Sequence, residues 1–210
     1  MGAKVVLPWY CGPFHPHGSR DYLCGPFLKK LASKEIHLHD KTFVPYLDET
    51  AMLRAVDNIA SEMNTDFEGK TPLVVVVLNG AFVFGADLLK RLTFNCEVAF
   101  IRVSSYRGTA STGEVKEQMP LGADVSGRDV IVIEDIVDSG LTMENLRLRM
   151  TEAGADSVSL CTLLFKPDAF QGMFELRYVG IEIPDRFVVG YGLDYDGLGR
   201  NIPSIYQLKV

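Results

Sequence analysis

The stretch Val130-Ile-Val-Ile-Glu-Asp-Ile-Val-Asp-Ser-Gly-Leu-Thr142 decides the fold of this chain. It begins with an apolar run, 130–133, of the kind found in strands buried on both faces of a parallel sheet. Polar residues and a glycine come next, and residues 142–153 then have helical spacing that ends at Gly154. The stretch therefore predicts a buried strand, a polar turn and a helix.

The same alternation of strands and helices continues along the rest of the chain. Asp48 and Thr50 are candidate caps of an amphipathic helix at 48–63. Further strands are expected at 73–78, 98–103 and 157–165, and another helix at 82–92. Such alternation implies right-handed crossovers between parallel strands, so we expect an α/β fold with an open, mainly parallel twisted sheet and helices on both faces. Ligands bind beyond the carboxyl ends of the strands in such sheets.

One folded domain is expected from a chain of 210 residues, of which 47% are hydrophobic and 23% charged. Residues 1–40 are rich in Gly, Pro, His and aromatic residues without a sustained period. We predict that they form an irregular N-terminal extension, disordered or artefactual, on which function does not depend. Residues 41–210 are the expected folded domain. No apolar run reaches the roughly 18 residues that span a bilayer, and no signal peptide is recognised.

Charge and cysteine usage narrow the class of partner. A net charge of -6 and a pI near 5.2 disfavour electrostatic binding to nucleic acid, because such binding needs a clustered basic surface. Small molecules are therefore the expected partners, with neither nucleic acid nor membrane. Cys96 and Cys161 lie in apolar surroundings typical of buried free thiols, which favours a reducing, cytoplasmic location.

The N-terminal end has a second interpretation as a metal site. Cys11 and Cys24 belong to a repeated Cys-Gly-Pro-Phe tetrapeptide, and the histidines of the same end are His15, His17, His37 and His39. These residue types can bind structural zinc. No Cys-x-x-Cys spacing accompanies them, so a poorly ordered extension is the preferred interpretation.

The polar part of the opening stretch predicts a ligand site. Glu134 and Asp135 are adjacent at a strand end and repel each other unless a cation or sugar hydroxyls take up their lone pairs. Residues 139–142 offer backbone N–H groups, two hydroxyls and a positive helix end, which suit a phosphate. In the simpler alternative, Asp138 or Ser139 only caps the helix.

This stretch resembles the phosphoribosyl pyrophosphate signature of type I phosphoribosyltransferases. The resemblance implies the fold of that family, with a small hood built from the C-terminal segment. It also implies that Glu134 and Asp135 contact the ribose hydroxyls and bind Mg²⁺. The loop that would hold the 5-phosphate contains Asp138, Ser139, Gly140, Leu141 and Thr142.

Two further motifs resemble the hypoxanthine-guanine branch of the family. Leu78-Asn79-Gly80 is similar to its pyrophosphate loop, in which a non-proline cis peptide exposes an N–H to the leaving group, although many members have Lys where this chain has Asn79. Ser105-Tyr106 matches the Ser-Tyr pair of a closing lid within the expected mobile loop 104–113. A plain Asn-Gly turn and a surface hairpin are the simpler alternatives.

The C-terminal half carries the expected purine site. Lys166, in Lys166-Pro-Asp168, matches a lysine that bonds the exocyclic oxygen of the purine. The segment Pro184-Asp-Arg-Phe-Val-Val-Gly-Tyr-Gly-Leu-Asp-Tyr195 is the most branch-specific match. By resemblance, Phe187 stacks on the purine, Val188 contacts its edge, Asp194 helps to hold Mg²⁺, Arg200 reaches the pyrophosphate and Ile136 packs against the base. Taken singly, these residues also fit strand core or a solvated lysine.

The resemblance implies a purine-salvage enzyme that transfers the phosphoribosyl group to N9 of hypoxanthine or guanine, giving IMP or GMP and pyrophosphate. Asp138 is the expected catalytic residue, sharing the proton at purine N7. Mg²⁺ is the expected cofactor, and a homodimer or homotetramer the expected assembly. Two alternatives remain, a xanthine-preferring relative and a non-catalytic phosphoribosyl pyrophosphate sensor that regulates nucleotide genes.

Overall fold

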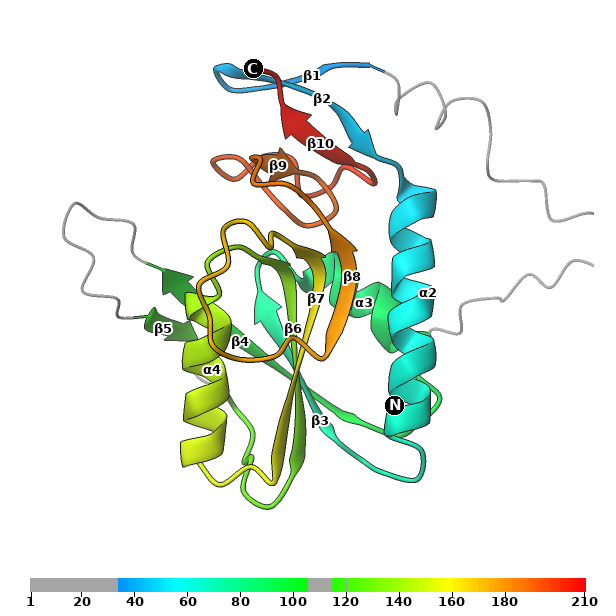
Figure 1. Ribbon diagram of the computed structural model, residues 1–210, viewed down its shortest axis with the longest axis vertical. Helices are drawn as coiled ribbons and strands as arrows, with labels where there is room; N and C mark the ends of the chain where they lie inside the picture. Colours follow the sequence, from blue (N-terminus) through cyan, green and yellow to red (C-terminus); the bar gives the residue numbers. More distant parts are fainter. Residues whose placement is uncertain (1–33, 106–114, 120) are drawn as a thin grey trace, which may run out of the picture. The chain divides into compact units, whose positions relative to one another are not determined.

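The computed structural model describes residues 34–105, 115–119 and 121–210 (Figure 1). The chain divides into the units Met1–Ser33 and Lys34–Val210, and only the second is described below. The cysteines and two of the histidines of the suggested zinc site therefore lie outside the described residues. The described fold begins before residue 41, because Ile36–Leu38 forms strand β1.

A six-stranded sheet is the centre of this unit, with the order β5-β4-β3-β6-β7-β8. Its strands are β3 (Leu73–Leu78), β4 (Glu97–Ser105), β5 (Val115–Met119), β6 (Asp129–Val137), β7 (Ser157–Phe165) and β8 (Tyr178–Glu182). All neighbours pair in parallel except β5, which runs antiparallel to β4 at the edge. The expectation of an open, mainly parallel sheet is confirmed.

Helices cover both faces of the sheet, as predicted. Helices α2 (Glu49–Asp66) and α3 (Phe82–Leu89) lie on one face, and α4 (Leu141–Glu152) lies on the other (Figure 1). The Asp48 carboxylate accepts a hydrogen bond from the Ala51 N–H at 2.7 Å, so this predicted cap is confirmed. The apolar residues expected to face inward on α2 are buried: Met52, Ala55, Val56, Ile59, Ala60 and Met63.

Strand β6 is longer than predicted, and this changes where the acids lie. The apolar run suggested a strand at 130–133, but β6 continues to Val137. Its pairing with β7 continues through Glu134↔Thr162 and Ile136↔Leu164. This pairing supplies hydrogen-bond partners for the backbone N–H and C=O groups of the polar residues. Glu134 and Asp135 are therefore part of the buried strand, and only Asp138 follows it.

A second, four-stranded antiparallel sheet has the order β1-β2-β10-β9. Strands β2 (Lys41–Leu47), β9 (Val188–Val189) and β10 (Ile205–Leu208) pack a small core of Phe43, Val189 and Tyr206. This sheet lies beyond the carboxyl ends of the parallel strands (Figure 1). The sequence predicted a small hood built from the C-terminal segment alone. The two strands formed by residues 36–47, β1 and β2, were not predicted.

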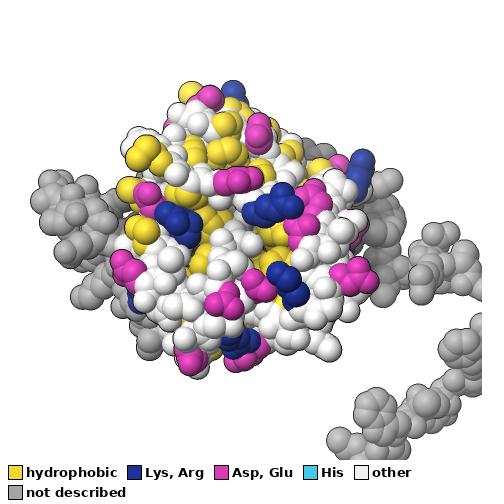
Figure 2. Space-filling model, turned by 60° about the horizontal axis from the view of Figure 1, so that its bottom comes forward, with side chains coloured by type: hydrophobic (Ala, Val, Ile, Leu, Met, Phe, Trp, Pro, Cys, Tyr) yellow, Lys and Arg dark blue, Asp and Glu magenta, His cyan; other side chains and the backbone are white. Residues whose placement is uncertain are grey.

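The structure also describes the surface charge, the cysteines and the hydrophobicity of the helices. On the face shown in Figure 2, the Lys and Arg side chains of the described residues are interspersed with Asp and Glu and form no basic block. Both described cysteines are free thiols, Cys161 buried and Cys96 half-buried. None of the described helices is long and apolar enough to cross a membrane.

Candidate active site

Gly80 and Asp135 bring the ends of β3 and β6 into contact. A Cβ atom at Gly80 would lie 1.6 Å from the Asp135 Oδ2 atom, so the position accepts only glycine with this arrangement. The peptide bond Leu78–Asn79 is cis, as the resemblance implied. The Asn79 side chain is exposed, beside this contact.

Glu134 and Asp135 form a buried pair of carboxyl groups with 9% and 8% of their surface exposed. Burial raises the pKa of Glu134 well above its usual value, and the neighbouring Asp135 charge adds to the effect. Burial also raises the pKa of Asp135, although hydrogen bonds to the Glu134 side chain and the Ile136 N–H oppose it. The pair is suited to a bound cation or to sugar hydroxyls, which would stabilise its charge.

Arg200 is held in place by the segment that precedes it. Its Nη1 atom donates to the Gly192 carbonyl oxygen at 2.7 Å, and its Nη2 atom lies 2.6 Å from Asp194 Oδ1. Gly192 in turn packs on the loop after β3, because a Cβ there would lie 2.1 Å from the Gly80 carbonyl oxygen. We call Gly80, Asp135, Gly192, Asp194 and Arg200 the arginine cluster. Its guanidinium charge opposes, without cancelling, the rise in the pKa of Asp135 that burial causes.

The predicted magnesium ligands do not make an all-protein site. Within residues 34–105, 115–119 and 121–210, no three His, Cys, Asp or Glu side chains are grouped to hold a metal ion. Asp194 is engaged by Arg200 and by the Gly197 N–H, at 2.6 Å each. Glu134 and Asp135 remain as paired oxygen ligands, and Mg²⁺ commonly takes one or two carboxylates together with substrate phosphates and water. That pair fits a magnesium ion that arrives with a substrate.

The turn between β6 and α4 has the features of an anion site. Gly140 is the N-cap of α4 with φ 86°, a left-handed conformation that favours glycine, and α4 has no side-chain cap. The N-cap residue of this helix is therefore Gly140 and not Asp138 or Ser139. Phe170 packs against Gly140, and the Gln171 N–H donates to the Ser139 carbonyl at 3.1 Å. Leu141 is exposed and Thr142 half-buried at the first helical turn.

Lys166 lies between two carboxylates at the end of β7. Its Nζ atom is 3.2 Å from Asp138 Oδ2 and 2.9 Å from Asp185 Oδ1. Only 8% of the lysine side chain is exposed, so it is not the solvated strand-end residue of the simpler alternative. The backbone fixes its place, because the Lys166 N–H donates to the Val137 carbonyl at 2.9 Å. We call Asp138, Lys166 and Asp185 the lysine cluster.

An aromatic group lies on the second sheet. Phe187 is 46% exposed, and its ring centroid is 6.2 Å from that of Phe43 and 5.8 Å from that of Tyr195. Val188 is buried in β9, and Ile136 is partly buried against the core of the α2 face. Phe187 therefore has the exposed ring that stacking on a ligand needs, whereas Val188 can offer only its backbone.

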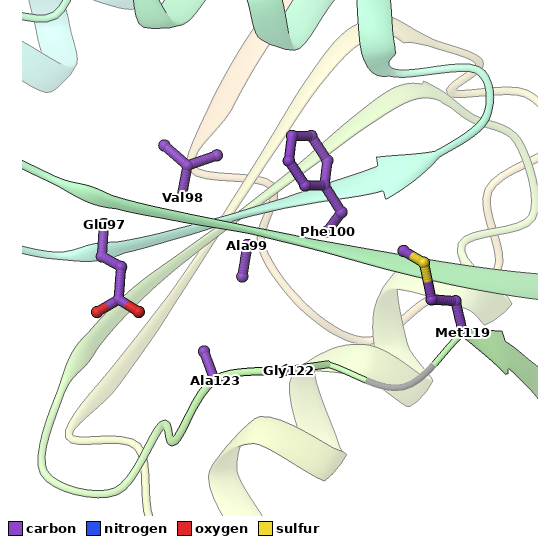
Figure 3. Close-up of a pocket in the computed structure, with 7 residues that line it drawn as sticks. All are labelled: Glu97, Val98, Ala99, Phe100, Met119, Gly122 and Ala123. Atoms are coloured by element: carbon purple, nitrogen blue, oxygen red, sulfur yellow. The ribbon is translucent and has the colours of Figure 1, made fainter. Parts of the chain in front are cut away.

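Only part of the predicted lid is described, and the surface pocket lies apart from these clusters. Ser105 ends β4, its side chain is not described, and Tyr106 lies outside the described residues. Figure 3 shows a pocket at the opposite, amino end of β4, lined by Glu97, Val98, Ala99, Phe100, Met119, Gly122 and Ala123. Among these described lining residues, the one charged side chain, Glu97, pairs with Arg128 at 2.7 Å. They include no cluster of polar groups with which to hold a charged substrate.

Sequence reasoning missed two residues of the site, Asp185 and Gly192. Both lie within the quoted segment 184–195, but their roles depend on partners from β7 and from the loop after β3. The resemblance of segment 184–195 was therefore the only sign in the sequence that these two residues belong to the site.

Comparisons with known proteins agree with this geometry. The phosphoribosyl transferase domain family matches residues 45–196. A hypoxanthine-guanine phosphoribosyltransferase from Staphylococcus aureus is 38% identical over 173 residues, covering 82% of this chain and 97% of that protein. The bifunctional protein TilS/HprT of Listeria monocytogenes is 46% identical over 173 residues, but this chain spans only 27% of its length.

A solved structure gives the same result for the fold. The hypoxanthine-guanine phosphoribosyltransferase of Bacillus anthracis superposes with a TM-score of 0.75 at 36% identity, covering 82% of this chain and 100% of that chain.

Proposed function

Because this chain belongs to the phosphoribosyl transferase family, we propose that it transfers the 5-phosphoribosyl group of phosphoribosyl pyrophosphate to N9 of hypoxanthine or guanine. The products are IMP or GMP and pyrophosphate. The observation that carries the proposal is the position of Lys166 and of the Glu134–Asp135 pair at the ends of the adjacent strands β7 and β6. A group that can recognise an oxopurine thus lies beside a pair that can bind a ribose.

The phosphoribosyl pyrophosphate would be held at three points. Glu134 and Asp135 take the ribose hydroxyls and, with them, Mg²⁺, which when bound supplies positive charge to the leaving pyrophosphate. The 5-phosphate binds in the loop 138–142 at the amino end of α4, where the N-cap residue is Gly140 and backbone N–H groups suit an anion. The Gly80 N–H and the remaining donors of Arg200 hold the pyrophosphate. This backbone role at Gly80 does not need a lysine at Asn79.

The purine would lie between the second sheet and the lysine cluster. Phe187 stacks on its ring, Val188 contacts its edge through the backbone, and Lys166 donates to the 6-oxygen. Such a donor disfavours adenine, whose 6-amino group cannot accept from an ammonium. Ile136 contributes apolar surface, and Ser105 and Tyr106 belong to the lid that excludes water.

In the transfer step, purine N9 attacks ribose C1 with inversion while the bond from C1 to the pyrophosphate oxygen breaks. Asp138 accepts or shares the proton at purine N7, which is expected to contribute about 10² to 10⁴ in rate. The backbone N–H groups and Arg200 stabilise the charge that develops on the leaving group. The net charge of -6 and the free thiols support a small-molecule enzyme of the cytoplasm. The homodimer or homotetramer is proposed from the family resemblance alone.

The test is pyrophosphate release from phosphoribosyl pyrophosphate and Mg²⁺ with four bases in parallel. We expect release with hypoxanthine and guanine and little with xanthine or adenine. Release with xanthine alone would replace the proposal with the xanthine-preferring enzyme. Binding of phosphoribosyl pyrophosphate without release for any base would replace it with the sensor.

A further inference from the structure

Asp185 is the closer of the two carboxylates that hold Lys166. Strands β6, β7 and β8 are neighbours in the sheet. Asp138 follows β6, Lys166 follows β7 and Asp185 follows β8, so the acids approach the lysine from the strands on its two sides. The distances from Nζ are 2.9 Å to Asp185 and 3.2 Å to Asp138.

The geometry of an ammonium group makes this arrangement directional. Lys166 Nζ has three N–H donors at tetrahedral angles. One is directed to Asp138 and one to Asp185, so the direction of the third is fixed. Without Asp185, the ammonium would be free to rotate about a single contact and would pair with Asp138 alone.

We infer that Asp185 is a positioning residue for base recognition, which holds Lys166 so that its third N–H meets the 6-oxygen of the purine. This inference rests on the proposed function. Asp185 acts through Lys166 and need not touch the substrate.

The exposure of Asp185 makes it a good site for substitution. Its side chain is 60% exposed, against 8% for Lys166. Replacing it by asparagine buries no new group and leaves Lys166 paired with Asp138, so the fold should be retained. Asp168 provides a matched control, because it is an exposed aspartate only two residues from Lys166 that makes no bond to it.

The experiment compares the full-length wild type with Asp185→Asn, Asp185→Glu and Asp168→Asn by titration calorimetry. The probes are IMP and purine ribonucleoside 5′-monophosphate, which lacks the 6-oxygen. We expect Asp185→Asn to bind IMP about tenfold more weakly, the usual effect of losing a well-placed charged hydrogen bond, and to bind the analogue as the wild type does. Asp185→Glu should recover part of the preference, and Asp168→Asn should keep all of it.

Three results overturn the inference, and they are distinguishable. If the wild type prefers IMP and Asp185→Asn keeps the same preference, Asp185 does not position Lys166, and the proposed function stands. If the wild type binds both nucleotides equally or neither, the proposed function fails, and this inference fails with it. A purely structural role for Asp185 would weaken the binding of both nucleotides alike, which also contradicts the inference.

Discussion

At the scale of single residues, the site depends on close contacts between backbone and carboxylate. Gly80 lies against the Asp135 carboxylate, and Gly192 lies against the Gly80 carbonyl. These two contacts join segments from β3, β6 and the region after β9. The position of Asp135, and through Gly192 that of Arg200, therefore depends on the absence of two Cβ atoms.

Substituting Gly80 by alanine should disrupt the site. The new Cβ would lie 1.6 Å from Asp135 Oδ2, so either the loop or the carboxylate must move. We expect kcat/KM for phosphoribosyl pyrophosphate to fall about 100-fold, the effect of a misplacement of roughly 1 Å, and stability to fall by about 1 to 3 kcal/mol.

Gly122→Ala is the control for this variant, since a Cβ there meets nothing within 4 Å. Steady-state kinetics and urea unfolding check both variants. Wild-type kinetics in Gly80→Ala would show that the Gly80–Asp135 contact does not shape the site.

The residues of the site differed in how far sequence could predict them. The acids and the glycine of 134–142 are contiguous, and their unusual combination next to an apolar run indicated a ligand site. Asp185 and Gly192 gave no such signal, because each acts on a partner that is distant in sequence. The pairing of Asp194 with Arg200 likewise gave no signal in the sequence, because it depends on how the loop between them folds.

At the scale of elements, the C-terminal end of α2 is tied to β8. The Asp66 Oδ2 atom accepts hydrogen bonds from the Tyr178 hydroxyl at 2.8 Å and from Arg177 Nη2 at 2.7 Å. Asp66 is the last residue of α2, and Tyr178 is the first of β8. This contact holds the helix over the edge of the sheet that leads to Asp185.

The Asp66→Asn variant tests this contact through the pH dependence of the free energy of unfolding. The hydrogen bonds from Tyr178 and then Arg177 lower the pKa of Asp66 below its usual 3.8. A lowered folded-state pKa gives stability that is present above pH 3.8 and is lost as the pH falls through the folded value. We expect Asp66→Asn to cost about 1 kcal/mol or less at pH 7 and to lose stability less steeply than the wild type below pH 3.8.

Urea unfolding at a series of pH values measures both effects. The exposed Asp156→Asn variant serves as the control. Equal pH slopes for the wild type and Asp66→Asn would contradict the assigned contact.

Most elements were predictable because their apolar periodicity is strong, and β3 and β7 begin and end where sequence placed them. The end of β6 was not predictable. Glu134 and Asp135 look like loop residues until the partner strand β7 supplies their backbone hydrogen bonds. Strands β1 and β2 were also missed, because their polar residues weaken the apolar pattern and because they depend on pairing with each other and, for β2, with β10.

At the scale of the whole described unit, the second sheet joins residues from both ends of the sequence. Near the β1–β2 turn, His39 Nε2 lies 3.1 Å from the Asp196 carbonyl oxygen. The Tyr195 hydroxyl donates to Asp40 Oδ1 at 2.7 Å. Because the Tyr195 ring also contacts Phe187, residues 36–40 support the surface on which the purine is proposed to stack.

Two truncations separate the N-terminal segment from this support. Removing residues 1–33 should leave activity unchanged, so we now limit the dispensable segment to residues 1–33, whereas the sequence had suggested residues 1–40. Removing residues 1–40 also removes β1 and the Tyr195–Asp40 bond, and we expect the KM for hypoxanthine to rise about fivefold, the effect of one hydrogen bond. Steady-state kinetics with hypoxanthine varied check both. Equal KM values for the two truncations would contradict the role given to residues 36–40.

The most direct test of the central claim is formation of IMP from hypoxanthine and phosphoribosyl pyrophosphate with Mg²⁺, followed by mass spectrometry for the wild type and Asp138→Asn. The wild type is predicted to give IMP and pyrophosphate in equal amounts, and Asp138→Asn to give IMP about 10² to 10⁴ times more slowly. Free ribose 5-phosphate without IMP, or equal rates for the two proteins, would contradict the account.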